Sequence, residues 1–409
     1  MALGTGDKQH VGAPPRRVTI LGATGSVGRN TLDLINRRPE AYDVVALTAQ
    51  SNVELLAAQA RQCNAEIAVI GDESHYAALR DALAGSGGEV AAGAAALCEA
   101  AGRSSEWVMA GIVGAAGLGP TLAAVRRGAI VALANKECLV CAGELMLEEV
   151  RRSGATLLPV DSEHNAIYQV FDFDRPHTVD RIILTASGGP FLRMDVTAMA
   201  RVSPAQAVAH PNWDMGDKIS VDSATMMNKG LETIEAYHLF PVRADQIETL
   251  IHPQSVVHSL VGFVDGSVLA QLGAPDMRTP IAYTLAWPDR MATPSERLDL
   301  ARIGNLSFEA PDPMRFPSLR LAREALAAGG TAPTVLNAAN EIAVAAFLAE
   351  HLGFLEIARV VEETLSKITV SSVTELADIA AADAEARATA RQLAGLPPLS
   401  DGRLSLVQG

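Results

Sequence analysis

The sequence predicts an α/β protein whose N-terminal part is a parallel sheet with helices on both faces. Short apolar, partly β-branched runs alternate with segments of helical periodicity such as 29–36 and 53–62, and these runs are 17–22, 44–48, 67–70, 107–110 and 129–133. Such alternation is typical of a doubly wound, Rossmann-like sheet. A glycine-rich turn after the first run favours the same fold class. Between 85 and 102, glycine and alanine blur the periodicity, and no element is assigned there.

The rest of the chain predicts two further domains. Strand patterns at 182–185, 246–252, 256–260 and 267–272 follow one another with little helix between some of them, which favours a mixed or antiparallel sheet. From Ser318 onward alanine and leucine recur at helical spacing. We therefore expect an N-terminal domain at 1–160, a central α+β domain at 161–286, a proline-rich linker at 287–316 and a small C-terminal helical domain at 317–409.

Composition and charge exclude several classes of protein. The 409 residues are 49% hydrophobic, which suffices for sizeable cores, and a formal net charge of −14 disfavours nucleic acid and anionic membranes as partners. The chain contains no apolar run of the roughly 18 residues that a membrane-spanning helix needs, and residues 1–17 lack the apolar core of a secretory signal. Four cysteines are too few for a disulfide scaffold, and the Cys138–Cys141 pair lacks the second pair of a structural zinc site. We expect a protein of the reducing cytoplasm.

The turn Gly22 to Gly28 is a candidate dinucleotide site. It lies between a predicted strand and a predicted helix, where glycines allow the backbone to approach a pyrophosphate and the helix N-terminus binds its oxygens. The second strand ends at Gln50-Ser51-Asn52, without the carboxylate that would bind the ribose of NAD. This favours NADP. Asn135, Lys136 and Glu137 follow a later strand, at the edge where open α/β sheets bind ligands.

Two acidic segments are candidates for a metal site. Asp161 and Glu163 follow a short strand, and in an extended segment both carboxylates would point to the same side and could share Mg²⁺ or Mn²⁺. The segment 222–235 is expected to begin a capped helix at Asp222-Ser223, with Asn228, Lys229 and Glu232 on one face. Isolated segments of this kind are more often exposed acids and surface Lys–Glu pairs. Glu235 is assigned to that surface alternative.

Two loops are candidates for substrate contacts. Ser187 begins a Gly-Gly-Pro turn whose free amides suit a phosphate group. The loop from His210 to Lys218 contains Trp213 and Met215, which we interpret as a lid over an apolar face of a ligand, with burial in the core as the alternative.

These segments, in this order, resemble one family closely, the 1-deoxy-D-xylulose 5-phosphate reductoisomerases. The matching blocks extend over most of the chain: GATGSVG (22–28), LANKE (133–137), PVDSEHNAIYQ (159–169), ASGGPF (186–191), HPNWDMG (210–216), KISVDSATMMNKGLE (218–232), HPQSVVHS (252–259) and NAANEIAVAAFL (337–348). The resemblance implies an enzyme that depends on NADPH and on Mg²⁺ or Mn²⁺, with Co²⁺ as a further candidate. It would convert 1-deoxy-D-xylulose 5-phosphate, a small sugar phosphate, to 2-C-methyl-D-erythritol 4-phosphate in the non-mevalonate route to isoprenoids, as a homodimer.

The resemblance also assigns roles to residues of these blocks. The catalytic set would be Lys136, Asp161, Glu163 and Glu232, of which the three carboxylates would ligate the metal. Substrate contacts would come from Lys136, Ser162, Glu163, Ser187, His210, Ser223, Asn228, Lys229 and Glu232. NADPH would lie against Thr24, Gly25, Ser26, Val27, Gln50, Ser51, Asn52, Asn135, Glu137 and Gly216, and Trp213 and Met215 would form the lid. The chain departs from the family at Ser51, where a basic residue is frequent, and at Asp214 and Asp217, which add negative charge to the lid.

Two other classes compete with this interpretation. A semialdehyde dehydrogenase-like enzyme would share the glycine loop and use a cysteine such as Cys138 or Cys141 as its nucleophile. A non-catalytic NADP-binding sensor would account for residues 18–30, but it gives no reason for Asp161, Glu163, Glu232 and Lys229 to converge.

Overall fold

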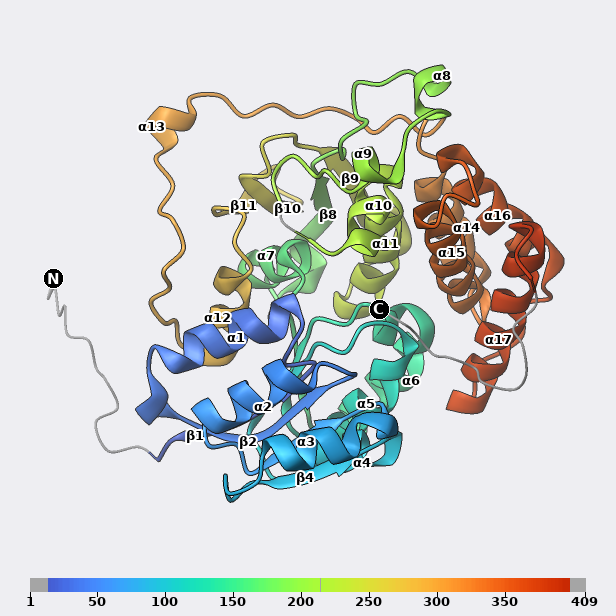
Figure 1. The fold of residues 1–409 in the computed structure, drawn as a ribbon. Helices are drawn as coiled ribbons and strands as arrows, with labels where there is room; N and C mark the ends of the chain where they lie inside the picture. The colour runs from blue at the N-terminus through green and yellow to red at the C-terminus, as the bar shows by residue number, and fades with distance from the viewer. Residues whose placement is uncertain (1–13, 214, 398–409) are drawn as a thin grey trace, which may run out of the picture.

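The computed structural model describes residues 14–213 and 215–397, so that Asp214 and both ends of the chain lie outside the described residues. Figure 1 shows the N-terminal α/β part below a second, smaller sheet, with a group of helices from the C-terminal end of the chain beside them. None of the described helices is long and apolar enough to span a lipid bilayer.

The N-terminal part is a seven-stranded parallel sheet in the order β4-β3-β2-β1-β5-β6-β7. Its strands are β1 (Arg16–Leu21), β2 (Tyr42–Ala49), β3 (Ile67–Ile70), β4 (Glu89–Ala92), β5 (Trp107–Ala110), β6 (Ile130–Leu133) and β7 (Thr156–Pro159). The helices between them are α1 (Ser26–Asn36), α2 (Val53–Gln62), α3 (Tyr76–Ala82), α4 (Ala94–Gly102), α5 (Leu118–Arg126) and α6 (Glu137–Ser153). Most residues of the central strands are buried, as expected for a sheet covered on both faces.

The order of the strands places a switch point between β1 and β5. The chain leaves β1 toward β2 on one side and returns to β5 on the other, so the turn after β1 opens at the crevice where such sheets bind ligands. The predicted α/β class and its parallel sheet are confirmed. The unassigned stretch 85–102 forms β4 and α4, which the small residues concealed because they give neither element a clear apolar period.

The central part is a four-stranded mixed sheet in the order β11-β10-β8-β9. β8 (Val179–Ala186) runs parallel to β9 (Ile247–Ile251) and antiparallel to β10 (Val257–Phe263), which pairs with β11 (Val268–Leu272). The mixed sheet is as predicted. Its accompanying helices are α7 (Ser162–Val170), α8 (Val196–Met199), α9 (Pro204–Ala207), α10 (Asp217–Thr225), α11 (Met227–Leu239) and α12 (Arg278–Ala286).

The C-terminal part is helical, as expected, and packs against the rest of the molecule. It consists of α14 (Ser318–Ala328), α15 (Ala332–Leu348), α16 (Phe354–Lys367) and α17 (Leu376–Leu393), preceded by a long connection that contains only α13 (Leu300–Ile303) and crosses the outer side of the central part (Figure 1). One continuous core joins α5 and α6 of the first part to α11 and to these helices. At Gly230 of α11 a Cβ atom would lie 2.8 Å from that of Ala322, so this glycine permits the close packing on α14.

Five short 3-10 turns complete the description: η1 (Pro39–Ala41), η2 (Glu73–His75), η3 (Ala115–Gly117), η4 (Pro176–Thr178) and η5 (Ala244–Gln246). The division of the chain into the four ranges given above stays a prediction. Within the range expected for the central domain, Ile281 and Leu285 of α12 are buried in the core of the N-terminal sheet.

Candidate active site

A cavity of about 210 Å³ lies between the carboxyl ends of the first sheet and the central part. Ser26 and Val27 of the turn after β1 line it, and so do residues that follow β6, β7 and β8. Every predicted metal, substrate and lid residue is among its lining: Lys136, Asp161, Ser162, Glu163, Ser187, His210, Trp213, Met215, Ser223, Asn228, Lys229 and Glu232. The tertiary structure thus brings together the predicted residues from Lys136 to Glu232, which are 96 positions apart.

Three carboxylates form the centre of this cavity. Oxygen atoms of Asp161, Glu163 and Glu232 all lie within 4.8 Å of one another, as the sequence led us to expect. The expected local geometry was wrong, however. Asp161 is the N-cap of α7, its side chain accepting from the backbone N–H of Glu163 at 3.2 Å, so the two acids belong to a helix start instead of an extended strand.

Two lysines neutralise part of this charge. Nζ of Lys136 donates to Asp161 Oδ2 at 3.2 Å, to Asn228 Oδ1 at 2.6 Å and to Glu232 Oε1 at 3.4 Å, which uses all three of its protons. Nζ of Lys229 contacts Glu232 and lies 3.2 Å from Glu163 Oε1. Asn228 and Lys229 occupy the first turn of α11. That helix begins at Met227, not at Asp222, because Met226 adopts a left-handed conformation (φ 62°) and separates it from α10.

The electrostatic environment sets the protonation of the cluster. Burial alone lowers the pKa of Lys136, but the neighbouring carboxylates of Asp161 and Glu232 outweigh it and raise that pKa well above its usual value. Burial raises the pKa of Asp161, yet Lys136 and His164 hold it well below the usual range. Burial is the largest effect on Glu163 and raises its pKa to about 7. Lys136 is therefore an ammonium ion at neutral pH, and the carboxyl group of Glu163 titrates near that pH.

A second cluster lies directly behind the first. Nδ1 of His164 is 3.1 Å from Glu235 Oε2 and 3.3 Å from Asp161 Oδ1, while Nε2 is 3.0 Å from the backbone carbonyl of Glu232. That carbonyl can only accept, so Nε2 carries a proton, and the two carboxylates raise the pKa of His164 despite burial, which lowers it. The assignment of Glu235 to the surface was wrong, since it is only 1% exposed. Its position one helical turn after Glu232 was the signal that could have placed it here.

Ser187 and His210, which also line the cavity, form a hydrogen-bonding pair. The ring nitrogen Nδ1 of His210 accepts from the backbone N–H groups of Asn212 at 3.2 Å and Trp213 at 3.0 Å. The proton therefore resides on Nε2, which donates to Ser187 Oγ at 2.8 Å. Ser187 Oγ also accepts from the N–H of Gly189 at 3.1 Å. With both lone pairs engaged, the hydroxyl proton of Ser187 remains available for a ligand in the cavity.

The predicted lid residues Trp213 and Met215 line the cavity from the loop before α10. The ring of Trp213 lies 6.1 Å from that of His258, and Met215 contributes to the same wall. Asn212 fixes the loop by donating to the backbone carbonyl of Pro253 at 2.7 Å and to Ser255 Oγ at 2.9 Å. Burial lowers the pKa of His258 to about 4, so this ring is neutral near pH 7 and presents an uncharged surface to Trp213.

The glycine turn has the conformation that a dinucleotide site needs. Gly22 has φ 82°, and its N–H donates to Thr48 Oγ1 at 3.0 Å. A Cβ atom at Gly28 would lie 2.3 Å from the carbonyl oxygen of Gly22, so only glycine lets α1 start this close to β1. Of the predicted cofactor residues, Ser26, Val27 and Gly216 line the cavity.

The other predicted cofactor residues lie outside the cavity. Thr24 and Gly25 belong to the glycine turn, Gln50 and Ser51 are exposed after β2, and Asn52 caps α2. The side chains of Asn135 and Glu137 are buried in internal contacts. Cavity-lining residues that the sequence did not suggest include Asn30, Ile219, Met226, Ser255, His258 and Met277.

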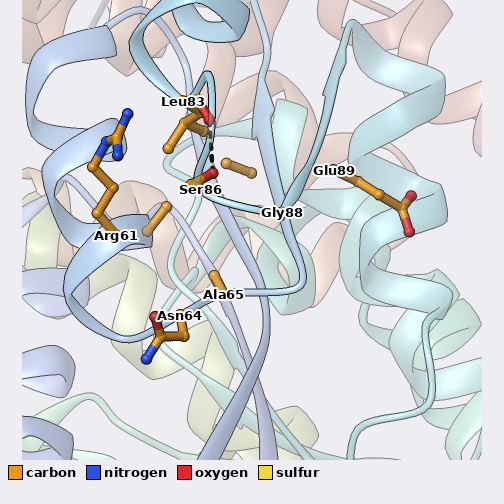
Figure 2. Close-up of a pocket in the computed structure, with 9 residues that line it drawn as sticks. Arg61, Asn64, Ala65, Leu83, Ser86, Gly88 and Glu89 are labelled. Carbon is orange, nitrogen blue, oxygen red and sulfur yellow. Dashed lines mark hydrogen bonds between the residues drawn. The ribbon is translucent and has the colours of Figure 1, made fainter.

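A smaller cavity of about 150 Å³ lies at the opposite, amino-terminal end of the strands β3 and β4 (Figure 2). Arg61 at its rim donates to the backbone carbonyls of Ala82 and Ala84, and Ser86 donates to that of Leu83. Glu89 points away and pairs with Arg103. These contacts are structural, and the cavity shares no residue with the acidic cluster.

The structure does not support a cysteine nucleophile. Cys138 and Cys141 are buried in α6 and do not line the cavity. Burial raises the pKa of Cys138 to about 12 and that of Cys141 well above the usual value, so neither supplies a thiolate near neutral pH.

A dinucleotide-type glycine turn that faces a cluster of carboxylates and lysines defines the class: an α/β oxidoreductase with a cation site. Three family models match the chain. The model described as 1-deoxy-D-xylulose 5-phosphate reductoisomerase matches residues 18–143, and the model of the C-terminal domain of that enzyme matches residues 157–240. A third model, described as DXP reductoisomerase C-terminal domain, matches residues 272–389. The chain belongs to the 1-deoxy-D-xylulose 5-phosphate reductoisomerase family.

Individual relatives agree over nearly the whole length. The reductoisomerase of Rhodospirillum centenum is 65% identical over 92% of this chain and 94% of its own, and that of Zymomonas mobilis is 59% identical over 93% and 98%. The solved structure of a Zymomonas mobilis reductoisomerase in complex with NADPH has a TM-score of 0.89 at 57% identity, covering 93% of this chain and 99% of that one. A DOX-P reductoisomerase solved with NADPH, fosmidomycin and magnesium has a TM-score of 0.88 at 44% identity, covering 93% and 98%.

Proposed function

We propose that the cavity is the place where this chain binds 1-deoxy-D-xylulose 5-phosphate between a divalent metal ion and the nicotinamide of NADPH. The chain is an NADPH- and metal-dependent reductoisomerase of isoprenoid biosynthesis. The product expected is 2-C-methyl-D-erythritol 4-phosphate. The observation that carries the assignment of the site is the convergence of Asp161, Glu163 and Glu232 in the cavity that Ser26 and Val27 also line.

The donor set fits a hard divalent cation. Asp161, Glu163 and Glu232 supply only carboxylate oxygens, the ligands that Mg²⁺ and Mn²⁺ prefer. When bound, such an ion acts as a Lewis acid toward the substrate's oxygens and NADPH supplies the hydride. Lys136 and Lys229 offset the mutual repulsion of the carboxylates and so keep the site assembled.

We assign the phosphate group to the part of the cavity that Ser187, Ser223, Asn228 and Lys229 line, beside the carboxylates. The oxygen of Ser187 accepts hydrogen bonds from His210 and from the N–H of Gly189, which leaves its hydroxyl proton for the phosphate group. Charge-assisted hydrogen bonds from Lys229 orient a phosphate more strongly than neutral donors do. Closure of Trp213 and Met215 over the substrate excludes water, which strengthens these interactions.

Lys136 does not serve as a proton shuttle in this proposal. Its pKa is raised and its protons are all donated to Asp161, Asn228 and Glu232, so its role is to hold charge and geometry at the metal site. Any contact between Lys136 and the substrate requires one of these three hydrogen bonds to be exchanged.

The experiment that tests the function is NADPH consumption with 1-deoxy-D-xylulose 5-phosphate. We expect oxidation of NADPH in the presence of Mn²⁺, its loss on addition of a chelator and its recovery with excess Mn²⁺. Turnover that persists in chelator, or that is abolished by a thiol reagent without loss of structure, would contradict the proposal.

We further propose that the chain is a homodimer that works in the cytoplasm. Support for the dimer comes from β11, an edge strand of the mixed sheet on which Val268 and Leu269 are about half exposed (47% and 50%). An apolar edge of this kind favours pairing with a second copy. Sedimentation of the wild-type protein and of the Leu269→Lys variant tests this: a dimer and a monomer, respectively, are expected, and a monomeric wild-type protein would refute it.

A further inference from the structure

The block 337–348 contributes no residue to the cavity, yet it contacts the helix that follows the lid. Asn340 of α15 is fully buried and donates through Nδ2 to Asp222 Oδ1 of α10 at 2.7 Å. Asp222 is 1% exposed, and its other oxygen lies 2.9 Å from Nζ of Lys218. Without Asn340 and Lys218 the buried carboxylate of Asp222 would be unpaired, which would strongly destabilise the folded protein. The contact between Asn340 and Asp222 is therefore required by the burial of this charge.

The position of α10 determines the shape of the part of the cavity that we assign to the phosphate group. Ile219 and Ser223 line the cavity, and Met226 joins α10 to the helix that carries Asn228 and Lys229 without any intervening loop. The turn after Ser187 also packs closely against the backbone of α10. A Cβ atom at Gly189 would lie only 2.8 Å from the carbonyl oxygen of Ser223, so glycine is needed there. A small displacement of α10 therefore moves groups on both sides of the phosphate.

Lys218 ties α10 to the first part of the molecule as well. Its Nζ lies 3.7 Å from Oε1 of Glu137, the first residue of α6 and the neighbour of Lys136. The helix after the lid is thus held from two directions, by α6 through Lys218 and by α15 through Asp222. Hydrogen bonds fix the register of α10 more narrowly than apolar contacts would, since they are directional.

We propose that Asn340 is a positioning residue for substrate binding: by holding Asp222 it keeps α10, and with it Ser223 and the start of α11, in the arrangement that receives the phosphate group. The C-terminal helices then act on the site through this contact and not only as a support for the core. The inference rests on the proposed function, because it takes the cavity as the binding place of the sugar phosphate.

The test compares two buried asparagines of α15. Asn340→Leu removes the donor to Asp222, and Asn337→Leu is the matched control, because Asn337 is equally buried but donates to Glu341 at 3.0 Å. We expect Asn340→Leu to raise KM for 1-deoxy-D-xylulose 5-phosphate about tenfold, which is the effect expected from losing one hydrogen bond to a charged group. The change in kcat should be smaller, and the affinity for NADPH should be unchanged. Asn337→Leu should lower Tm similarly and leave KM within about twofold.

A charge exchange keeps the test decisive if Asn340→Leu folds poorly. Asn340→Asp places two carboxylates face to face and should impair substrate binding most, whereas the double variant Asn340→Asp, Asp222→Asn restores a donor and an acceptor and should recover most of the loss. A KM that is unchanged in Asn340→Leu, or raised equally in both leucine variants, or a double variant no better than Asn340→Asp, would overturn the inference.

Hydrogen exchange separates this inference from the proposed function. In the ligand-free protein, Asn340→Leu should speed exchange of the amides in Asp217–Thr225 but not in the C-terminal half of α11, whatever the substrate is. Equal exchange of Asp217–Thr225 in wild type and variant would refute the positioning role. A wild-type protein that fails to oxidise NADPH with the sugar phosphate would instead refute the proposed function.

Discussion

Lys136 Nζ donates to Oδ1 of Asn228 at 2.6 Å, which joins the end of β6 to the first turn of a helix 92 positions further along the chain. The amide of Asn228 is thereby oriented, and its Nδ2 donates to Glu232 Oε1 at 2.5 Å. Lys136 and Asn228 thus connect the seven-stranded sheet to the acidic cluster of Asp161, Glu163 and Glu232.

Replacing Glu232 by Gln should abolish metal-dependent turnover while NADPH still binds. The substitution keeps the size of the side chain but removes one of the three negative charges in the cluster. NADPH oxidation and NADPH binding by fluorescence measure the two properties separately. Glu248→Gln, at an exposed carboxylate of β9, is the control and should behave like wild type. Wild-type activity of Glu232→Gln would remove the metal assignment.

Lys229→Ala should mainly weaken binding of the substrate. A charged hydrogen bond to phosphate contributes about 1.5–3 kcal/mol, so KM should rise roughly ten- to a hundredfold with a smaller change in kcat. Steady-state kinetics with varied 1-deoxy-D-xylulose 5-phosphate measure this. Lys367→Ala, at the exposed end of α16, serves as control. An unchanged KM for Lys229→Ala would count against a role in phosphate binding.

Trp213→Ala should impair closure of the lid, whereas Trp213→Phe should retain much of it because an aromatic ring remains against His258. We expect the alanine variant to lose at least about tenfold in kcat/KM, which corresponds to roughly 1.4 kcal/mol and is modest for the loss of a half-buried aromatic side chain. Comparison of kcat and KM for the two variants measures the effect. If neither constant changes in Trp213→Ala, the lid assignment is wrong.

The affinity for Mn²⁺ should depend on pH through Glu163. Burial raises the pKa of Glu163 to about 7 in the metal-free protein, so below that pH a metal ion must displace a proton, whereas above it the carboxylate is already ionised. The apparent Kd should therefore rise up to about tenfold per unit as pH falls below 7, and level off above pH 7. Calorimetric titration with Mn²⁺ at pH 6, 7 and 8 measures this. Glu163→Gln should bind more weakly and lose the dependence, and a Kd that is constant across this range in the wild type would contradict the assignment.

Elements with a local sequence pattern were predictable from the sequence alone. The apolar runs near Val18, Val44 and Val131 predicted buried parallel strands. Each of these runs can be recognised as a strand from its own residues, without knowledge of the rest of the chain. The glycine turn was recognisable because Gly22 and Gly28 meet steric demands set by their immediate neighbours. The region of β4 and α4 failed for the converse reason, since its small side chains carry little periodic signal.

The residues of the cavity were recognised from local motifs and from family resemblance, but their arrangement was not. The sequence by itself determined the fold class, the glycine turn and the residue types that are proposed to ligate a cation. Only the tertiary structure decided that Asp161 caps a helix, that His164 and Glu235 lie buried behind the carboxylates, and that Asn340 reaches Asp222. The physical reason is that capping and strand formation follow from neighbours in sequence, whereas the burial and pairing of a charge depend on which distant segments pack around it.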